Sequence, residues 1–288
     1  MLMNDVRYGY KALLKSIIVF LCLLIVPLVV TIVIQEYTGK IEKMMEIWPK
    51  ELIALCGITN IQSKTFSIIP FYMILIIVNM VAICRCASVA SMDMMRDEES
   101  GIIKHYINQP YTKLQIYIGK MIIAIVMALI QWFEYCLMLI MMVAILCKIN
   151  GLRFEDELSD VYSISVRGIV FVIFMLSISI LFNTIIDRSM SLGNFLTIIC
   201  TISFFVGNFY KIFEIIGYYI RRLQGNENTI AFLADLTRNF RIMYPFTLLN
   251  ILNTENKPLP GGVYCIYFMI SVGVLVLCGY VYSKKDFS

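Results

Sequence analysis

The chain alternates long apolar stretches with shorter polar segments. Each apolar stretch has about 20 residues or more, enough for an α-helix to cross the roughly 30 Å hydrocarbon core of a bilayer. Transmembrane strands would be about half as long and would alternate in polarity, whereas these stretches are apolar on every face. The pattern predicts six transmembrane helices, at residues 16–35, 66–90, 120–147, 167–186, 190–210 and 260–283.

Composition supports a membrane fold. Hydrophobic residues make up 60% of the chain, and the mean hydropathy is +0.81. A soluble core of ordinary size cannot bury that much apolar side-chain surface. No segment between the apolar stretches is long enough for a typical soluble domain, and no internal repeat is visible. We therefore expect one all-α integral membrane domain over residues 1–288.

The N-terminal segment predicts a helix lying at the membrane interface over residues 4–15. Arg7, Lys11 and Lys15 form one helical stripe, and apolar residues form the opposite one. The apolar stretch that follows is longer than a signal peptide core and has no small-residue cleavage site. We expect an uncleaved anchor that leads into the first span.

Charge distribution predicts the orientation. Six spans place both termini on the same side. The short segments on that side hold ten basic residues, and the outer segments hold 13 over about twice the length. Long loops weigh little in the positive-inside rule, which therefore assigns the short segments to the cytoplasm. The expected location is a bacterial plasma membrane, crossed several times. Residues 211–262 then form an outer segment, whose amphipathic part either lies on the outer leaflet or covers a translocation path. The basic residues expected inside are Arg7, Lys11, Lys15, Arg96, Lys104, Lys113, Lys120, Arg188, Lys284 and Lys285.

The loop at residues 91–119 predicts a short cytoplasmic helix. Asp97, Glu98 and Glu99 would be favourable at its start, where the helix dipole attracts carboxylates. Apolar residues then share one face over residues 102–107, and Pro110 ends the helix. Such a helix either presents its apolar face to a cytoplasmic partner or rests on the inner leaflet.

At these residues the chain resembles the permease subunits of bacterial type-2 ABC transporters. The shared pattern is an acidic pair, a glycine, a short apolar stretch and a proline, followed by Gly119-Lys120 before the third span. Ile102 stands where such permeases usually have threonine. The resemblance extends to six spans with a long outer segment before the last. It implies an ATPase-coupling set of Glu98, Glu99, Gly101, Ile102, Ile103, Tyr106, Ile107 and Pro110.

The resemblance also implies partners. The short helix would be the coupling helix, docked on a separate ATPase subunit, and a second permease chain, identical or homologous, would share the pathway. ATP and Mg would bind the ATPase subunit, so this chain would carry no cofactor and would not be an enzyme. The residues agree with that division, because no G-x-x-x-x-G-K-[ST] phosphate loop occurs in the chain. Nucleic acid is not an expected partner.

The expected activity is ATP-driven export of a peptide, drug or other amphipathic substrate, and antimicrobial peptide resistance is one role that the resemblance suggests. An intramembrane enzyme is disfavoured, because the chain has one histidine, His105, and the Glu98-Glu99 pair lacks an arginine four residues later. A non-pumping membrane immunity or channel protein remains the alternative. The nine cysteines suggest buried thiols, with neither a disulfide framework nor a metal site.

Polar residues inside the spans are the remaining functional candidates. Glu134 is the acid deepest within a predicted span, and Gln131 shares its helix face. Intramembrane charges are costly and usually face a cavity or a partner, so both residues are candidates for a translocation path. The alternative is that Glu134 only holds two helices together. We expect Arg85 to extend toward the interface, and Asn79 and Asn183 to form hydrogen bonds between helices.

Overall fold

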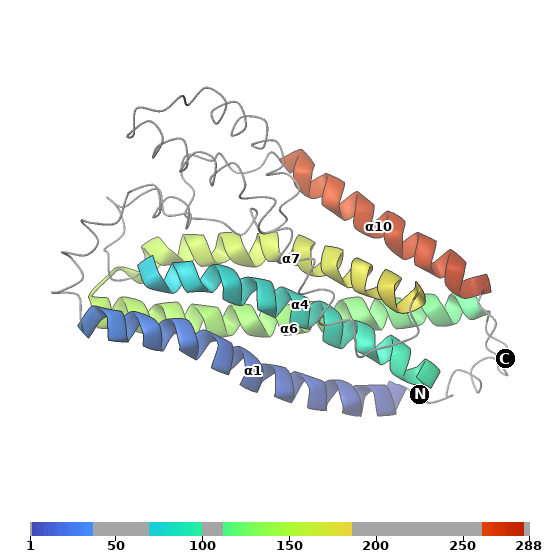
Figure 1. Cartoon of the computed structure of the whole chain (residues 1–288), viewed down its shortest axis with the longest axis horizontal. Helices are drawn as coiled ribbons and strands as arrows, with labels where there is room; N and C mark the ends of the chain where they lie inside the picture. Colours follow the sequence, from blue (N-terminus) through green and yellow to red (C-terminus); the bar gives the residue numbers. More distant parts are fainter. Residues whose placement is uncertain (1, 37–68, 100–111, 186–260, 285–288) are drawn as a thin grey trace, which may run out of the picture.

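A computed structural model describes residues 2–36, 69–99, 112–185 and 261–284, and these residues form five α-helices without a strand among them (Figure 1). The prediction of an all-α fold is confirmed for this part of the chain. The fifth predicted span, at residues 190–210, and nearly all of the outer segment 211–262 lie outside it. The helices are α1 (Leu2–Glu36), α4 (Ile69–Glu99), α6 (Lys113–Asn150), α7 (Phe154–Ile185) and α10 (Gly261–Lys284).

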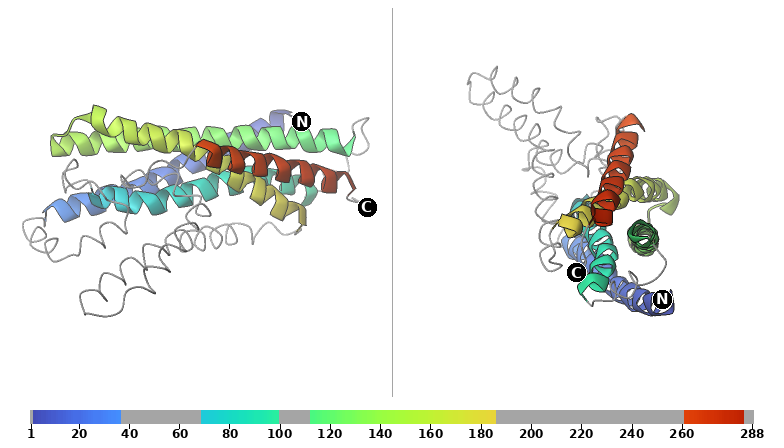
Figure 2. Two further views of the ribbon diagram at one scale, coloured as in Figure 1. Left: turned by 90° about the horizontal axis from the view of Figure 1, so that it is seen from above. Right: turned by 90° about the vertical axis from the view of Figure 1, so that its right-hand side faces the viewer.

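The five helices run lengthwise through one elongated bundle (Figures 1 and 2). Helix α7 packs against α4, α6 and α10, while α1 packs against α4 and α6. The start of α1, the end of α4, the start of α6 and the ends of α7 and α10 gather at one end of the bundle (Figure 1). We call it the terminal end. The N-terminal end of α1 and the C-terminal end of α10 thus lie at the same end of the bundle, as an even number of spans would require.

Four helices are long and apolar enough to cross a membrane, over Leu14–Val33, Lys113–Asn150, Ser165–Ile185 and Gly262–Lys284. They match four of the predicted spans in position. The predicted span at residues 66–90 corresponds to α4, in which a shorter apolar segment, Val78–Met92, has been identified. The outward surfaces of the helices carry large apolar side chains, as expected for contact with lipid, among them Val29, Ile130, Phe133, Met141 and Met269.

Helix α1 includes the residues that were predicted to form an interfacial helix. Residues 4–15 continue directly into the first span, because α1 is continuous from Leu2 to Glu36. Pro27 lies inside α1, where it cannot donate a backbone hydrogen bond, and the Thr31 hydroxyl donates to the Pro27 carbonyl at 2.6 Å. Apolar packing on both sides of the proline keeps the helix unbroken.

Helix α6 is the longest described helix, and capping residues define both of its ends. The Thr112 side chain accepts from the Gln115 backbone N–H, and the Gln115 side chain accepts in return from the Thr112 N–H. At the other end Gly151 adopts a left-handed conformation, and the Leu152 N–H donates to the Cys147 carbonyl at 2.9 Å. A tight corner at Gly151 therefore joins α6 to α7.

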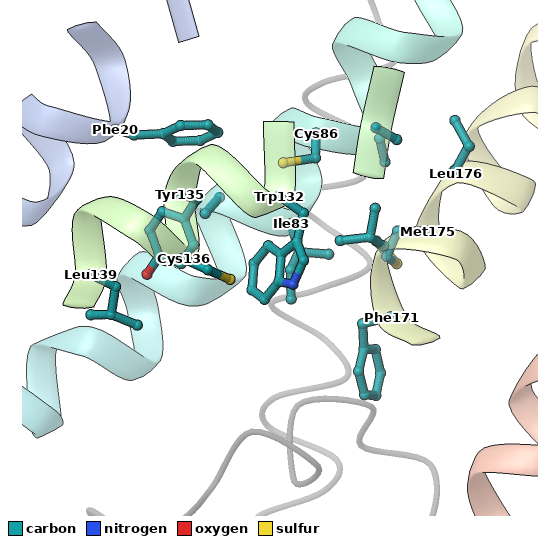
Figure 3. Packing of buried hydrophobic residues seen from close by; sticks show 14 of the residues in the cluster. Phe20, Ile83, Cys86, Trp132, Tyr135, Cys136, Leu139, Phe171, Met175 and Leu176 are labelled. Carbon is teal, nitrogen blue, oxygen red and sulfur yellow. The ribbon is translucent and has the colours of Figure 1, made fainter. Parts of the chain in front are cut away.

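The core lies where α6 faces the other helices. Figure 3 shows Trp132, Tyr135 and Cys136 of α6 between Phe20 of α1 and Phe171 of α7. The Phe20 and Tyr135 rings meet edge to face with centroids 5.4 Å apart, and the Trp132 and Tyr135 rings are 5.2 Å apart. Aromatic packing thus fixes the middle of α6 in the centre of the bundle.

Candidate functional site

Glu134 lies near the middle of α6, inside its long apolar surface. Its side chain is partly buried, and its Oε2 accepts a hydrogen bond from the Ser16 hydroxyl of α1 at 3.1 Å. A carboxylate in a lipid environment is costly unless a polar group or a cavity compensates it. The structure thus places Glu134 against α1, where a hydroxyl satisfies one of its oxygens.

Gln131 lies one helical turn before Glu134 and is fully buried. Neither its amide nitrogen nor its amide oxygen has a hydrogen-bond partner among the described residues. An unpaired amide in an apolar interior costs on the order of 2–7 kcal/mol, depending on the reference state. Apolar packing does not compensate this cost, so Gln131 is the best candidate in this region for a group that binds water or a ligand.

Asn79 of α4 connects these residues to the neighbouring helix. The Tyr135 hydroxyl donates to the Asn79 Oδ1, and both side chains are buried. Asn183 of α7 donates through its Nδ2 to the Ser91 carbonyl of α4 at 3.3 Å. The prediction that Asn79 and Asn183 form hydrogen bonds between helices is therefore confirmed.

Trp132 shows why Gly168 is needed opposite α6. The indole Nε1 donates to the Ser165 carbonyl of α7 at 3.0 Å, and the ring lies directly on Gly168. A Cβ atom at Gly168 would overlap the Trp132 ring. The missing side chain thus lets a large aromatic ring anchor α6 to α7 beside Glu134.

Arg85 of α4 is only partly enclosed in the bundle. Its Nε is buried and has no hydrogen-bond partner among the described residues, and the side chain as a whole is partly exposed. Its neighbour Cys86 is fully buried. No described hydrogen bond or ion pair joins Arg85 to Glu134, and the extension of Arg85 toward the interface stays a prediction.

The predicted coupling set is described only at its start. Glu98 and Glu99 are the last described residues of α4, which is continuous from Ile69, so they continue this helix and do not begin a separate short one. The remaining six positions lie outside the described residues: Gly101, Ile102, Ile103, Tyr106, Ile107 and Pro110.

Metal ligation and disulfide formation find no support within the described helices. No group of three or more histidine, cysteine or acidic side chains is arranged there to hold a metal ion. The seven cysteines in this part of the chain are free thiols. The chemistry that these helices offer is therefore hydrogen bonding and charge, provided by Ser16, Asn79, Arg85, Gln131, Glu134 and Tyr135.

Comparisons of the chain with protein-family models, with curated proteins and with solved structures find no match. No family is therefore shown for this chain, and the likeness to type-2 ABC permeases rests on the sequence pattern alone.

Proposed function

We propose that this chain is the membrane-spanning permease subunit of an ATP-driven exporter, with six transmembrane helices and type-2 ABC architecture. A separate ATPase subunit would supply the energy, and a second permease chain would complete the pathway. The cargo would be a peptide, drug or other amphipathic molecule. Both termini and residues 91–119 would be cytoplasmic in a bacterial plasma membrane.

The observation that carries the proposal is the position of α4 and α6. The end of α4 and the start of α6 lie at the same end of the bundle (Figure 1), so the predicted coupling segment connects two long helices. Those helices contact each other through the buried Tyr135–Asn79 hydrogen bond and carry Gln131 and Glu134 in their middle. A displacement of the connecting segment would thus be transmitted along α4 and α6 to Gln131 and Glu134.

Gln131 and Glu134 would contribute to the translocation path. Gln131 offers an unpaired donor and an unpaired acceptor, and Glu134 offers a carboxylate with one hydrogen-bonded oxygen. Both groups can exchange their present surroundings for contacts to a polar part of the cargo when the bundle changes conformation. The surrounding apolar walls suit the rest of an amphipathic molecule.

The test is co-purification with Ile103→Asp as the variant. A charge on the apolar face of the predicted coupling helix would disrupt docking on the ATPase, because a buried unpaired carboxylate costs several kcal/mol. We expect wild-type chain purified from its own membranes to retain ATP hydrolysis activity. Ile103→Asp should reach the same abundance in membranes and lose that activity.

His105→Asp is the matched control, because residue 105 lies on the opposite, polar face of the predicted helix. It should retain the ATPase. If wild-type chain transports without any ATPase bound, the exporter proposal is wrong and the non-pumping immunity or channel function takes its place.

A further inference from the structure

Glu134 is an acidic side chain within the apolar part of α6, and no described basic side chain compensates it. Its Oε2 accepts a hydrogen bond from the Ser16 hydroxyl of α1 at 3.1 Å, and no described lysine, arginine or histidine forms an ion pair with it. A hydroxyl satisfies one lone pair of a carboxylate but leaves its charge uncompensated. A carboxylate at such a position is therefore expected to attract a positive charge.

Gln131 provides a second polar group next to this carboxylate. It lies three residues before Glu134 on α6, and side chains at this spacing are neighbours on a helix, with Cβ atoms about 5–6 Å apart. Gln131 is fully buried, and neither its amide oxygen nor its amide nitrogen has a hydrogen-bond partner among the described residues. Helix α6 thus presents an unpaired amide beside an uncompensated carboxylate, and a ligand between their ends would satisfy both.

A cation bound to the carboxylate gives each atom of the amide a partner. The Gln131 Oε1 would bind the cation, and the Gln131 Nε2 would donate a hydrogen bond to the carboxylate. Two oxygens that each lie about 2.3–2.6 Å from one cation can be up to roughly 5 Å apart, which the spacing of the two side chains allows. A water molecule would pair with the amide but would leave the charge of Glu134 uncompensated.

The charge of these groups favours a small monovalent ion. Glu134 is the one acidic side chain within the described candidate spans, so a divalent ion would leave a net positive charge in an apolar interior. Oxygen ligands suit hard cations, and a carboxylate attracts a smaller ion more strongly because the two charges come closer. Such a site needs only one acid, so it differs from the sites with three or more histidine, cysteine or acidic ligands that the described helices lack.

We propose that Glu134 and Gln131 bind Na⁺, and that the Ser16 hydroxyl of α1 holds the Glu134 carboxylate in position for the ion. The bound ion would neutralise Glu134 within the membrane and would give the buried amide of Gln131 its missing partners. The inference goes beyond the proposed function, because the site needs neither a cargo nor an ATPase.

The experiment measures the thermal unfolding of the full chain, purified in detergent with any subunits that remain bound, while NaCl replaces choline chloride at constant ionic strength. A ligand that binds only the folded state raises Tm by mass action. At a Na⁺ concentration about 100-fold above Kd, we expect Tm to rise by about 5 °C. KCl should give a smaller rise. A Tm that does not respond to NaCl would overturn the proposal, and an equal response to KCl would overturn the choice of Na⁺.

Two substitutions test the ligands one at a time. Glu134→Gln removes the charge and should abolish the response of Tm to NaCl. Gln131→Leu removes an unpaired amide at similar volume, so the variant should fold, and it should need about tenfold more Na⁺ for the same rise in Tm. An unchanged response in Gln131→Leu would overturn the role of the amide. Ser177→Ala should respond like wild type, because this buried serine of α7 donates to the Phe174 carbonyl of its own helix.

Labelling with dicyclohexylcarbodiimide separates Na⁺ from a proton as the occupant of the site. This apolar reagent adds to protonated carboxyl groups, and mass spectrometry of chain labelled in its own membranes quantifies the modified Glu134. At a Na⁺ concentration about tenfold above Kd, we expect modification to fall about tenfold relative to choline chloride. Modification that is independent of NaCl would assign a proton to Glu134 and overturn the proposal. If Glu134 is not modified in either salt, the response of Tm decides.

Failure of the cation site and failure of the proposed function give different results. A chain that responds to NaCl but retains no ATPase would leave the Na⁺ site standing and remove the exporter. A chain that retains its ATPase and shows no response to NaCl would leave the exporter standing and remove the Na⁺ site.

Discussion

Two polar junctions join helices inside this bundle, and they differ in charge and in how fully their groups are paired. The serine junction consists of Ser91, Ser179 and Asn183, which link α4 to α7 nearer the terminal end through neutral groups. The charged junction consists of Ser16 and Glu134, which link α1 to the middle of α6. The first resembles ordinary interhelical hydrogen bonding, whereas the second contains an ionisable carboxyl group.

The difference indicates where function lies. In the serine junction the two hydroxyls are 2.9 Å apart, and both serines are fully buried. The unpaired atom there is Asn183 Oδ1, a neutral oxygen. In the charged junction the described hydrogen bond of Glu134 comes from the Ser16 hydroxyl, and the amide of Gln131, one turn before Glu134, has no described partner. Stability alone favours neutral or fully paired groups, so an acidic side chain and an unpaired amide are candidates for contact with a ligand.

The largest expected effect concerns which side of the membrane each end of the bundle faces. We expect a cysteine introduced in place of Ser100 to resist an impermeant maleimide in intact cells. One in place of the exposed Arg153, beside the Gly151 corner, should react, as should one in place of Asn226. Labelling of Ser100→Cys alone would invert the topology and place the serine junction nearer the outside.

One native cysteine must be replaced before this experiment. Cys56 belongs to the predicted outer segment between the first two spans, so Cys56→Ser is the starting chain. Among the described cysteines, Cys86, Cys136, Cys147 and Cys278 are buried in the bundle, and Cys22 and Cys265 are exposed within candidate spans. The Cys56→Ser chain without an added cysteine, labelled under the same conditions, measures the remaining signal.

The next largest effect is expected at Gly168, which supports Trp132 beside the charged junction. Gly168→Ala would place a methyl group into the indole ring and should lower the free energy of unfolding by about 2–3 kcal/mol. Thermal unfolding in detergent measures this loss. Gly273→Ala is the matched control, because open space surrounds Gly273 on α10. If both variants unfold alike, Trp132 does not hold the two helices together as described.

The smallest effect is expected at the serine junction itself. Ser179→Ala removes one neutral hydrogen bond and should cost about 0.6 kcal/mol, the average for interhelical bonds in membranes. A Ser91→Ala, Ser179→Ala cycle should give a coupling of the same size. A coupling several times larger would contradict the description of this junction as ordinary interhelical hydrogen bonding.

The sequence predicted the parts of the fold that depend on length and apolarity. An apolar stretch long enough to cross a bilayer has few alternatives to a helix, because unpaired backbone groups are too costly in lipid. Hence four predicted spans match described helices closely, including α10, which was expected at residues 260–283 and is found at Gly261–Lys284. The extent of α4 was underestimated, because the glutamates at 98 and 99 suggested the start of a separate helix, whereas α4 continues through both.

The polar site was predicted only in part. Glu134 and Gln131 stand out in the sequence because polar groups are rare in such stretches. Their partners do not, since Ser16 is separated from Glu134 by 118 positions and only helix packing brings the two together. Position along a span does not reveal which face of a helix is enclosed, so the burial of the Arg85 Nε could be seen only in the packed bundle. The relation of Gly168 to Trp132 also requires the packed α6–α7 pair.

The length of α6 has a consequence for what an antibody can reach. Its 38 residues extend about 57 Å, whereas a whole bilayer with headgroups measures about 45 Å. A tilt of about 20°, the average for such helices, shortens the projection to only about 54 Å. If Lys113 lies in the headgroup region at one end, part of the surplus is expected at the Gly151 corner. An insertion tag between Gly151 and Arg153 should then be accessible to an antibody.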